Sequence, residues 1–539
     1  MGRRESTIHF KNAVIVKKTK ILLGTISIIH SNWIPYAVGC IISHCNKIQD
    51  ITDKYEFLPP IYKHAPVEEY KDVLLQTNIL GLTCYVWNQQ YNDELSVYFK
   101  SINPNGVIVY GGPQVPENSD QKKEFDLTRP WLHTSIAGLG EIAFSEWLLD
   151  LPFSNKKLTD IPTPYTDGIF EELLSSGEDF KVSFETNRGC PYSCSFCDWG
   201  GQSRSKLTTF GIDKVYQTID YLYTKKNVSE LEILDANFGI LARDIDIIDY
   251  MILQQNLNNN NLKISYSGLA KNGSKNLPII LEKIFNNVPI DQRNLKISFQ
   301  THTPEVLKIV NRSNIDNNRL LPLIQQYKAN NIPITSEMII ALPGETAESW
   351  LKTLHHNYHN LGIDYVRSYF LHLVTNIEMT TPFYKKKYDI KTKIVKIGHQ
   401  EFEIIHRCFS YDLEQLVLMF DYHWFYHNLI NTNLLKPYVS NLYEDCVRFF
   451  NVLDNFPQLR SIVESNRQFI RHIFSDEEIT TLDDKLSQRF FSSSMRRDDI
   501  KVMLNNQNAV SSELSLFLNK PLEIRWECDD VFGAMATIK

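Results

Sequence analysis

The sequence lacks the features of a membrane protein and of a nucleic-acid-binding protein. No apolar run reaches membrane-spanning length, and the apolar stretch Ile21–Ile29 lacks a cleavage site and is interpreted as a first strand. Basic residues are not in excess, since 56 Lys and Arg accompany 63 Asp and Glu for a formal net charge of −7. Runs such as Lys385–Lys387 are too short to form a nucleic-acid surface. We therefore expect a soluble chain without a membrane or nucleic-acid partner.

Cysteine is scarce and shows no pairing pattern. Nine cysteines are spread over 539 residues, which excludes the disulfide framework of small secreted proteins and favours the reducing cytoplasm as the location. A chain of this length is too long for one hydrophobic core, and it suggests about three domains.

Three cysteines form one dense motif. Cys190, Cys194 and Cys197 lie in the segment Glu185–Asp198, where glycine, proline and polar neighbours indicate a loop. A structural zinc site would need a fourth ligand nearby, and a ferredoxin-type run would need a fourth cysteine, and the segment offers neither. Three thiolates can instead bind three corners of an iron–sulfur cube. Its open fourth iron could chelate S-adenosylmethionine and pass it one electron, which cleaves it to a 5′-deoxyadenosyl radical.

The C-x3-C-x2-C spacing, with an aromatic residue directly before the last cysteine, resembles the radical S-adenosylmethionine superfamily. The resemblance implies one [4Fe–4S] cluster on Cys190, Cys194 and Cys197, with S-adenosylmethionine as a second cofactor and an external protein or reagent as electron donor. Trp199 and Gly200 follow the motif and are expected to form a wall beside the cofactor, since glycine permits a close approach of the main chain.

The N-terminal part alternates short apolar runs with amphipathic stretches, as an open parallel sheet with crossover helices does. Candidate strands are Ile21–Ile29, Ile79–Val86, Val107–Tyr110 and Ser135-Ile136. In such sheets ligands bind beyond the carboxyl ends of the strands. We therefore predict a doubly wound, Rossmann-like α/β domain over residues 1–165.

The order of these elements resembles the cobalamin-binding domain found ahead of many radical S-adenosylmethionine barrels. The similar segments are Trp33–Gly39, Pro60–Lys63, Tyr85–Asn88, Gly111–Pro116 and Gly140-Glu141. The resemblance implies that cobalamin, if it binds, lies against these segments. No Asp-x-His-x-x-Gly motif occurs, so the sequence identifies no lower axial histidine for cobalt. Cobalamin bound without one and an empty supporting domain both stay open.

A turn-rich segment, Asp160–Gly168, is interpreted as a linker between domains. Beyond it, six repeats of strand and helix predict a partial (β/α)6 barrel over residues 175–385, with its chemistry at the carboxyl ends of the strands. The expected strands are Val182–Thr186, Leu231–Leu234, Leu262–Tyr266, Leu295–Phe299, Ile334–Ile340 and Tyr365–Leu373. The cysteine loop follows the first strand, where such a barrel should carry it.

Polar residues stand on or after the other barrel strands, and the candidates are Asp235, Asn237, Lys271, Gln300 and Glu337. Their surroundings are similar to the family's Asp-Ala-Asn-Phe-Gly, Ser-Leu-Gln-Ser and Leu-Pro-Gly-Glu-Thr segments, although Phe299 and Thr301 depart from the second of these. The resemblance implies that they bind S-adenosylmethionine, for example at its ammonium or ribose. Each residue could equally cap a helix or form a turn.

Residues 386–539 are predicted to form a mainly helical domain. From Glu401 onward the pattern becomes helical and aromatic, and the aromatic stretch Phe420–Tyr426 is typical of a core seam. The segment Leu522–Trp526 is expected to form a final strand.

Cys408 bears on the type of reaction. A thiol gives up a hydrogen atom readily, so a thiol on the far side of a Cα radical would return hydrogen with inverted configuration. The family's proteusin-type peptide epimerases are similar in carrying a lone cysteine downstream of the barrel strands. We therefore expect Cα epimerisation, with Cys408 as donor, of a peptide that is ribosomally made.

Other interpretations remain beside epimerisation. Cys446 and Cys528 compete for the donor role, and Cys408 is otherwise an ordinary buried thiol. In a second interpretation, the N-terminal domain holds methylcobalamin and the enzyme methylates a carbon atom of a peptide or small molecule. In a third, the chain is a binding module whose cluster is structural or senses redox state.

Overall fold

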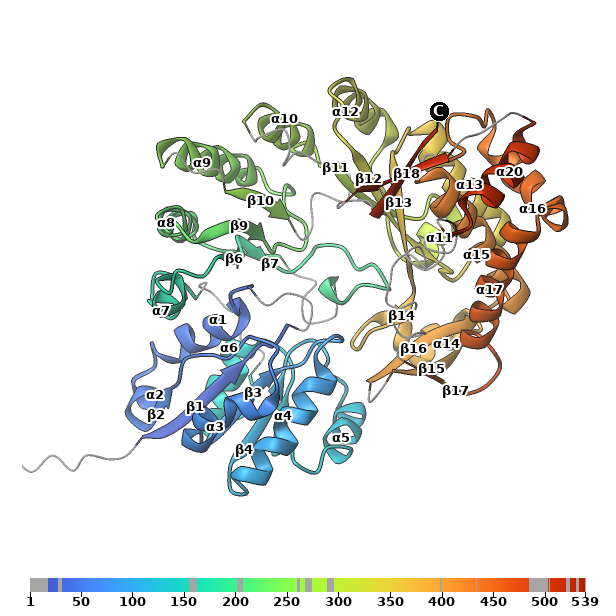
Figure 1. Cartoon of the computed structure of the whole chain (residues 1–539). Coiled ribbons are helices and arrows are strands. Elements are labelled where there is room, and N and C mark those ends of the chain that lie inside the picture. The colour runs from blue at the N-terminus through green and yellow to red at the C-terminus, as the bar shows by residue number, and fades with distance from the viewer. Residues whose placement is uncertain are drawn as a thin grey trace, which may run out of the picture. The chain divides into compact units, whose positions relative to one another are not determined.

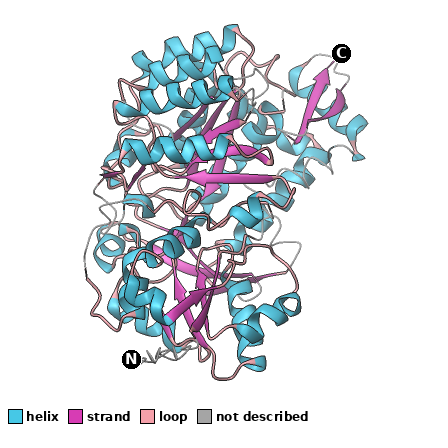
Figure 2. Ribbon diagram, turned by 90° about the vertical axis from the view of Figure 1, so that its left-hand side faces the viewer, coloured by secondary structure: helices cyan, strands magenta, loops and turns pink. Residues whose placement is uncertain are grey.

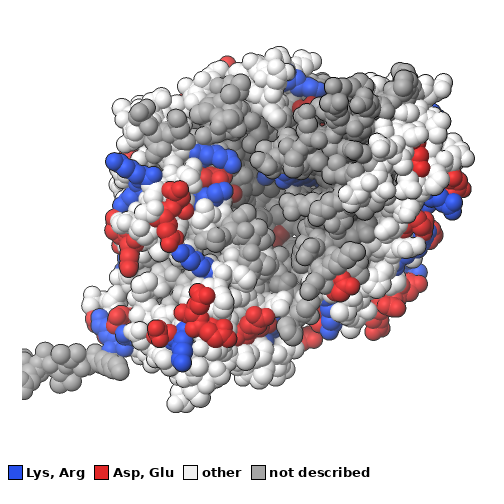
Figure 3. All heavy atoms as spheres, viewed as in Figure 1, with Lys and Arg blue, Asp and Glu red and all other residues white. Residues whose placement is uncertain are grey.

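The computed structural model describes residues 18–27, 32–154, 162–200, 207–258, 262–266, 274–287, 295–397, 400–432, 434–483, 503, 505–519, 524–529 and 533–538. The chain separates into two compact units, residues 1–172 and 173–539 (Figure 1). The three domains predicted from the sequence, over residues 1–165, 175–385 and 386–539, stay a prediction. Among the described helices, none is both long and apolar enough to cross a bilayer. Basic and acidic side chains lie interspersed on the face drawn in Figure 3.

The N-terminal unit contains a parallel sheet of five strands in the order β2-β1-β3-β4-β5. The strands are β1 (Thr19–Gly24), β2 (Tyr55–Phe57), β3 (Ile79–Thr83), β4 (Val107–Gly111) and β5 (Thr134–Ile136). The helices are α1 (Tyr36–Cys45), α2 (Gln49–Lys54), η1 (Val67–Tyr70), α3 (Lys71–Gln76), α4 (Gln89–Ile102), α5 (Ser119–Leu127) and α6 (Gly140–Leu148). The predicted doubly wound α/β fold is confirmed.

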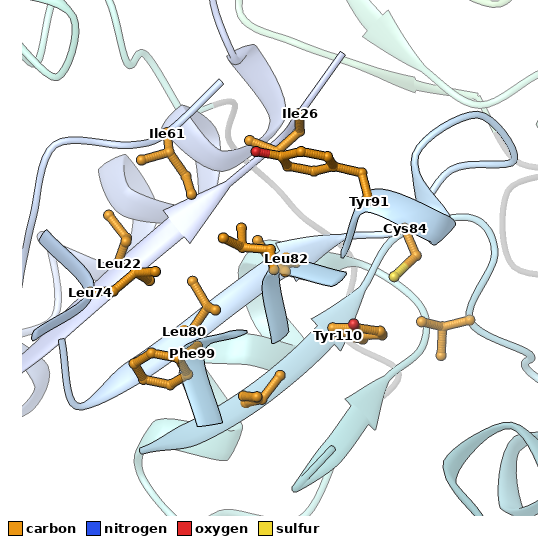
Figure 4. Close-up of a cluster of buried hydrophobic side chains, with 13 residues drawn as sticks. Leu22, Ile26, Ile61, Leu74, Leu80, Leu82, Cys84, Tyr91, Phe99 and Tyr110 are labelled. Carbon is orange, nitrogen blue, oxygen red and sulfur yellow. The ribbon is translucent and has the colours of Figure 1, made fainter. Parts of the chain in front are cut away.

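Alternation along the strands builds two cores, one on each face of this sheet. Leu80 and Ile108 point to one face, where Phe99 of α4 packs among them (Figure 4). The intervening Ile79 and Val109 point to the other face and pack against α1 and α6. Because each fully buried Leu, Ile or Phe contributes roughly 1.5–3 kcal/mol, the two faces hold the sheet between helical layers.

Strand β3 is shorter than the apolar run Ile79–Val86 predicted. The side chain of Asn88 ends the strand, because its Nδ2 donates to Thr83 O at 3.0 Å and its Oδ1 accepts from Tyr85 N at 2.8 Å. The predicted strand Ile21–Ile29 also ends early, at Gly24.

The second unit begins with the predicted barrel strands. One parallel sheet joins β6 (Phe180–Phe184), β9 (Val228–Ile233) and β10 (Lys263–Tyr266), and another joins β11 (Leu295–Gln300), β12 (Ile334–Ile340) and β13 (Tyr365–Phe370). Within the described residues, β10 pairs only with β9 and β11 only with β12. Figure 2 shows helices lying outside these strands. The remaining elements up to β13 are α7 (Glu171–Leu174), β7 (Asn187–Arg188), η2 (Asp198–Gly200), β8 (Thr208–Thr209), α8 (Ile212–Tyr223), α9 (Arg243–Leu257), α10 (Leu277–Asn287), α11 (Pro304–Ile309), α12 (Asn317–Ala329), α13 (Ala347–His355) and η4 (His356–Asn360).

The C-terminal part is less helical at its start than the sequence predicted. The expected last barrel strand, Tyr365–Leu373, divides into β13 and β14 (His372–Leu373), and β14 joins a second sheet of order β14-β16-β15-β17. The prediction of helix from Glu401 onward is wrong, because Gln400–Arg407 forms strand β16, with Phe402 and Ile404 buried two residues apart. Helix returns only at Leu413, where Asp412 caps α15 by accepting from Gln415 N.

The elements of this region are η5 (Glu378–Thr380), α14 (Pro382–Lys387), β15 (Lys391–Ile397), α15 (Leu413–Phe425), η6 (Tyr426–Ile430), α16 (Leu442–Asn451), η7 (Leu453–Asn455), α17 (Pro457–Ile473), β17 (Ile479–Leu482) and α20 (Gln507–Leu518). A final antiparallel hairpin joins β18 (Ile524–Asp529) to β19 (Gly533–Ile538). The expected strand Leu522–Trp526 overlaps β18, and its first two residues lie outside the described residues.

A side chain closes the outer edge of β13. Asn431, just after the π-helical turn η6, accepts from Val366 N at 3.1 Å and donates to Val366 O at 3.0 Å. Its amide thereby occupies the positions that a neighbouring strand would use. Tyr358 of the π-helical turn η4 stacks on Tyr426 of η6 with centroids 5.2 Å apart, so the two turns join the C-terminal helices to the barrel.

A substitution at Gly112 tests how closely the loops after β3 and β4 pack in the N-terminal unit. Its φ is +97°, and an added Cβ would lie 2.9 Å from Cys84 O and 3.0 Å from Cys84 N. Gly112→Ala is therefore expected to lower the free energy of unfolding of this unit by about 2 kcal/mol, measured by urea unfolding of the full chain. Gly138 is the control, because its φ is +90° but an added Cβ would meet nothing within 4 Å. An equal loss in both alanine variants would show that the contact with Cys84 contributes nothing.

Candidate functional site

The cysteine loop follows strand β6 and is contacted by the end of α11, by η5 and by α14. Ser195, between two of the cysteines, donates its N–H to Val310 O at 3.0 Å and accepts from Met379 N at 3.1 Å. Its hydroxyl lies 3.0 Å from the hydroxyl of Tyr384 on α14. Ser195 is buried, whereas the cysteines on either side are partly exposed. The loop is thus fixed at its back and open at its thiols.

Asp235 fixes the chain just before this loop. It lies after β9, is fully buried, and accepts from Thr186 N at 2.7 Å, Asn187 N at 3.2 Å and Asn187 Nδ2 at 2.5 Å. The hydroxyl of Thr186 is a further donor. Burial raises the pKa of Asp235 to about 7, although the hydrogen bonds from Thr186 and Asn187 lower it. These contacts support a positioning role for Asp235, and its predicted contact with S-adenosylmethionine stays a prediction.

Arg312 brings a positive charge to the three thiols. Its guanidinium is buried, and Nε donates to Phe299 O at 3.2 Å and to Asn314 Oδ1 at 3.0 Å. Its other contacts are Ser298 O and a hydrogen bond with Cys194. Burial lowers the pKa of Arg312, while Cys194, Cys197 and Cys190 raise it. The side chain therefore links the end of β11 to the cysteine loop.

A bulge at the end of β11 makes this link possible. The register of β11 with β12 shifts between Ser298 and Gln300, and Gln300 has a φ of +69°. This places Gln300, predicted to bind S-adenosylmethionine, in a backbone conformation that is rare for residues other than glycine. Carbonyl groups released from regular pairing can accept from Arg312. Strained backbone of this kind is common near functional sites.

The remaining predicted site residues are found in several environments. Glu337, on β12, accepts from Ser298 Oγ at 2.7 Å and lies 3.5 Å from Lys296 Nζ. Asn237 is buried after β9, and Trp199 is 45% exposed in η2, the short turn that Gly200 ends. Lys271 lies outside the described residues. The structure thus brings Glu337 next to the end of β11, and the contacts of all these residues with a cofactor stay predictions.

Cys408 lies in a tight turn rather than in an open pocket. It is buried, its N–H donates to Tyr411 O at 3.1 Å, and its Sγ lies 3.2 Å from Ser410 Oγ. Ser410 Oγ accepts from Gly344 N at 2.9 Å, and the Tyr411 hydroxyl donates to Ala341 O at 2.7 Å. The turn therefore packs on the loop that follows β12. These contacts support a structural role for the thiol.

Sequence reasoning missed Arg312, Tyr384 and Asn311, which all contact the cysteine loop. Asn311 Nδ2 donates to Ser193 O at 3.1 Å and to Ser193 Oγ at 2.6 Å. Nothing in their local sequence distinguishes them from surface residues, since the loop they contact lies more than a hundred residues earlier. The segment Asn311–Asn314, which follows a short helix after β11, offered only a turn signal.

The donor set fits a cluster better than a single ion. No three His, Cys, Asp or Glu side chains among the described residues converge as ligands of one metal ion do. A cube presents its irons at separate corners, so its thiolates stand farther apart than the ligands of one ion. Three thiols around one buried guanidinium, on a loop with its back fixed, suit such a group.

A second candidate site lies at the carboxyl ends of the strands in the N-terminal unit. The strand order reverses between β1 and β3, which is where open α/β sheets bind ligands. Cys84 N donates to Gly111 O at 2.6 Å, so the loops after β3 and β4 are tied together. Tyr85 and Trp87 stack with centroids 4.6 Å apart and an angle of 12° between their planes, and Trp87 is 39% exposed. A flat aromatic surface beside glycine backbone suits a planar macrocycle.

The chain is similar to several known radical S-adenosylmethionine proteins. The pattern of the Radical SAM superfamily matches residues 184–356. Over 390 residues the chain is 28% identical to the cobalamin-dependent radical SAM methyltransferase TokK of Streptomyces tokunonensis, covering 67% of this chain and 56% of that protein. It is 25% identical to the 2-(S-pantetheinyl)-carbapenam-3-carboxylate methyltransferase of Streptantibioticus cattleyicolor, with the same coverage of 67% and 56%. The match thus spans little more than half the length of either relative.

A solved structure has the same fold. The radical S-adenosylmethionine methyltransferase TsrM from Kitasatospora setae, solved with cobalamin and a [4Fe–4S] cluster bound, superimposes with a TM-score of 0.55 at 12% identity. The superposition covers 84% of this chain and 100% of that one. Residues 184–356 therefore form a radical S-adenosylmethionine domain, and the chain as a whole is similar to cobalamin-dependent enzymes that carry such a domain.

Proposed function

We propose that the protein is a cobalamin-dependent radical S-adenosylmethionine methyltransferase that methylates a carbon atom of its substrate. The observation that carries the proposal is the presence, in one chain, of a sheet with a ligand-binding switch point and a radical domain with a three-cysteine loop. Both curated relatives are named as methyltransferases. This favours the methylation alternative over the epimerisation that Cys408 suggested.

The contacts of Cys408 support the same choice. Its thiol is buried and lies against Ser410 in a turn whose other residues hold the loop after β12. A hydrogen donor must face the substrate, whereas a packing thiol need not. Methyl transfer requires no such donor, so the turn of Cys408 can be wholly structural.

The proposed cluster ligands are Cys190, Cys194 and Cys197. When bound, the cluster supplies the electron that cleaves S-adenosylmethionine, and cobalamin supplies the methyl group. The chain's own residues position these groups. Asp235 fixes the chain before the first cysteine, Ser195 anchors the loop between the last two cysteines, and Arg312 places a positive charge beside the thiols. In the other unit, Gly112 lets the loop after β4 pack closely on the backbone of Cys84, beside the stacked rings of Tyr85 and Trp87.

Substitution of Arg312 tests whether the cluster binds to the cysteine loop. Removing a positive charge beside the thiolates disfavours the reduced, more negative cluster, so Arg312→Gln should lower its reduction potential by on the order of tens of millivolts. The measurement is a redox titration followed by electron paramagnetic resonance. Arg312→Lys should recover part of the shift. Arg188→Gln is the matched control, because Arg188 pairs with Glu185 nearby. Replacing all three cysteines by alanine should abolish the cluster signal, and a retained signal would contradict the ligand assignment.

Trp87 tests the cobalamin site. The exposed stack of Trp87 on Tyr85 offers apolar area to a corrin ring, so Trp87→Ala should weaken cobalamin binding by about tenfold, as the loss of one aromatic contact of about 1.4 kcal/mol implies. Binding is measured by the visible absorption that stays with the protein after gel filtration. Trp147→Phe, on α6 of the same unit, is the control and should leave binding unchanged. Equal binding by Trp87→Ala and the wild type would show that the corrin lies elsewhere.

Cys408 separates the two reactions. With S-adenosylmethionine that carries a trideuterated methyl group, the reconstituted enzyme and a cell extract should yield a product with that methyl group, and only when cobalamin is present. Cys408→Ala should retain this activity, because methyl transfer needs no thiol. Mass spectrometry is the measurement. If the product instead gains deuterium from deuterated water, without a methyl group, and Cys408→Ala abolishes that gain, epimerisation is the reaction and the proposal is wrong.

A further inference from the structure

An exposed apolar and basic surface lies on helix α14 and on the turn after β16. Phe383 is 74% exposed and Phe409 is 55% exposed, and both are among the most exposed large apolar side chains of the described residues. Lys386 and Lys387, in the last turn of α14, are exposed beside them. We call Phe383, Lys386, Lys387 and Phe409 the α14 face. Exposed phenylalanines next to lysines are typical of a surface that binds another protein.

The charge of this surface is unbalanced. Lys385 pairs with Glu403 at 2.5 Å and Lys391 pairs with Asp389 at 3.1 Å. Lys386, Lys387 and Arg407 form no ion pair with any described residue, and Arg407 lies opposite Lys391 in the pairing of β15 with β16. Two acidic residues without a described ion pair lie near this surface, Glu378 on η5 and Asp412, whose side chain caps α15. The excess of positive charge favours an acidic partner.

The back of the same helix touches the cysteine loop. Tyr384 is the buried residue of α14, and its hydroxyl lies 3.0 Å from Ser195 Oγ and donates to Ile309 O at 3.1 Å. Ser195 directly follows Cys194. One short helix thus has its outer side in solvent and its inner side against the proposed cluster ligands.

Aromatic rings connect these two sides without a gap. The ring of Tyr384 lies 4.7 Å from that of Tyr388, and the ring of Tyr388 lies 6.0 Å from that of Phe409, both measured between centroids. A continuous series of contacts therefore connects the loop to the surface, formed by Ser195, Tyr384, Tyr388 and Phe409. A redox partner on the α14 face would therefore lie against side chains that are in continuous contact with the cysteine loop.

We propose that the α14 face docks a small acidic one-electron carrier protein, of the flavodoxin or ferredoxin type, which reduces the cluster. One electron passes from the reduced carrier to the oxidised cluster, the carrier is left oxidised by one electron, and no bond forms or breaks. Complexes of this kind are small, weak and steered by charge, which suits a surface of a few lysines around two phenyl rings. The proposal rests on the proposed function only in assigning the cluster to the cysteine loop.

The test compares two reductants. Lys386→Glu combined with Lys387→Glu should slow reduction of the reconstituted cluster by reduced flavodoxin about tenfold at low salt, measured by stopped-flow bleaching of the cluster absorption. Reduction by dithionite, a small reagent that needs no docking, should be unchanged. The wild-type rate with flavodoxin should fall as salt rises, and the variant should lose most of this dependence. Phe409→Ala should also slow only the reaction with flavodoxin.

The matched control reverses the charge of two lysines that lie before the start of a barrel strand. Lys225→Glu combined with Lys226→Glu, just before β9, should leave both reductions unchanged. An unchanged flavodoxin rate in the Lys386 and Lys387 variant, or an equal slowing with dithionite, would overturn the proposal. Absence of a cluster in the wild type would contradict the proposed function instead. In that case, binding of oxidised flavodoxin to cluster-free protein, measured by calorimetry on the wild type and the same variants, still decides the docking site.

Discussion

A single buried carboxylate constrains the site more than any other group. Asp235 has no solvent to stabilise its charge, and burial of an unpaired carboxylate would cost several kcal/mol. Four donors from Thr186 and Asn187 offset this cost. The carboxylate therefore holds the chain between β6 and the first cysteine at Thr186 and Asn187. The position of the three thiols depends on these contacts, as does their proximity to Arg312.

The two units use the same principle of sheet architecture. In each, parallel strands end at one edge, and the candidate site residues lie in the loops beyond that edge. The switch between β1 and β3 places the Tyr85 and Trp87 stack there, and the loop after β6 places the cysteines there. The Asn88 side chain and the main chain of Ser195 then hold these loops by bonding to backbone groups that regular pairing no longer satisfies.

The sequence predicted the parts of this fold that depend on local periodicity. Strand β12 lies at Ile334–Ile340 as expected, because its segment is rich in β-branched and apolar residues and is followed by a Pro-Gly turn. Strand β16 was mistaken for helix, because Phe402, Ile404 and Ile405 suit a helical stripe as well as a strand. Short apolar segments carry no periodicity that separates the two, and pairing with β15 decides between them.

The site itself was predictable only in part. The spacing of the cysteines is local and was visible, whereas Arg312 reaches them through a fold that brings together segments more than a hundred residues apart. The burial of Cys408 in a turn likewise depends on the loop after β12 and not on its neighbours in sequence. Residues that act on a site through tertiary contacts leave no pattern at their own positions.

Asn431 has a consequence for the chain in a crowded solution. A partial barrel has two free edges, and an exposed edge strand can pair with the edge of another molecule and start aggregation. By mimicking a peptide group against Val366, Asn431 occupies the donor and acceptor of the second residue of β13. The amide thereby makes the barrel end at its sixth strand on this side. An edge capped in this way offers another strand fewer groups to pair with.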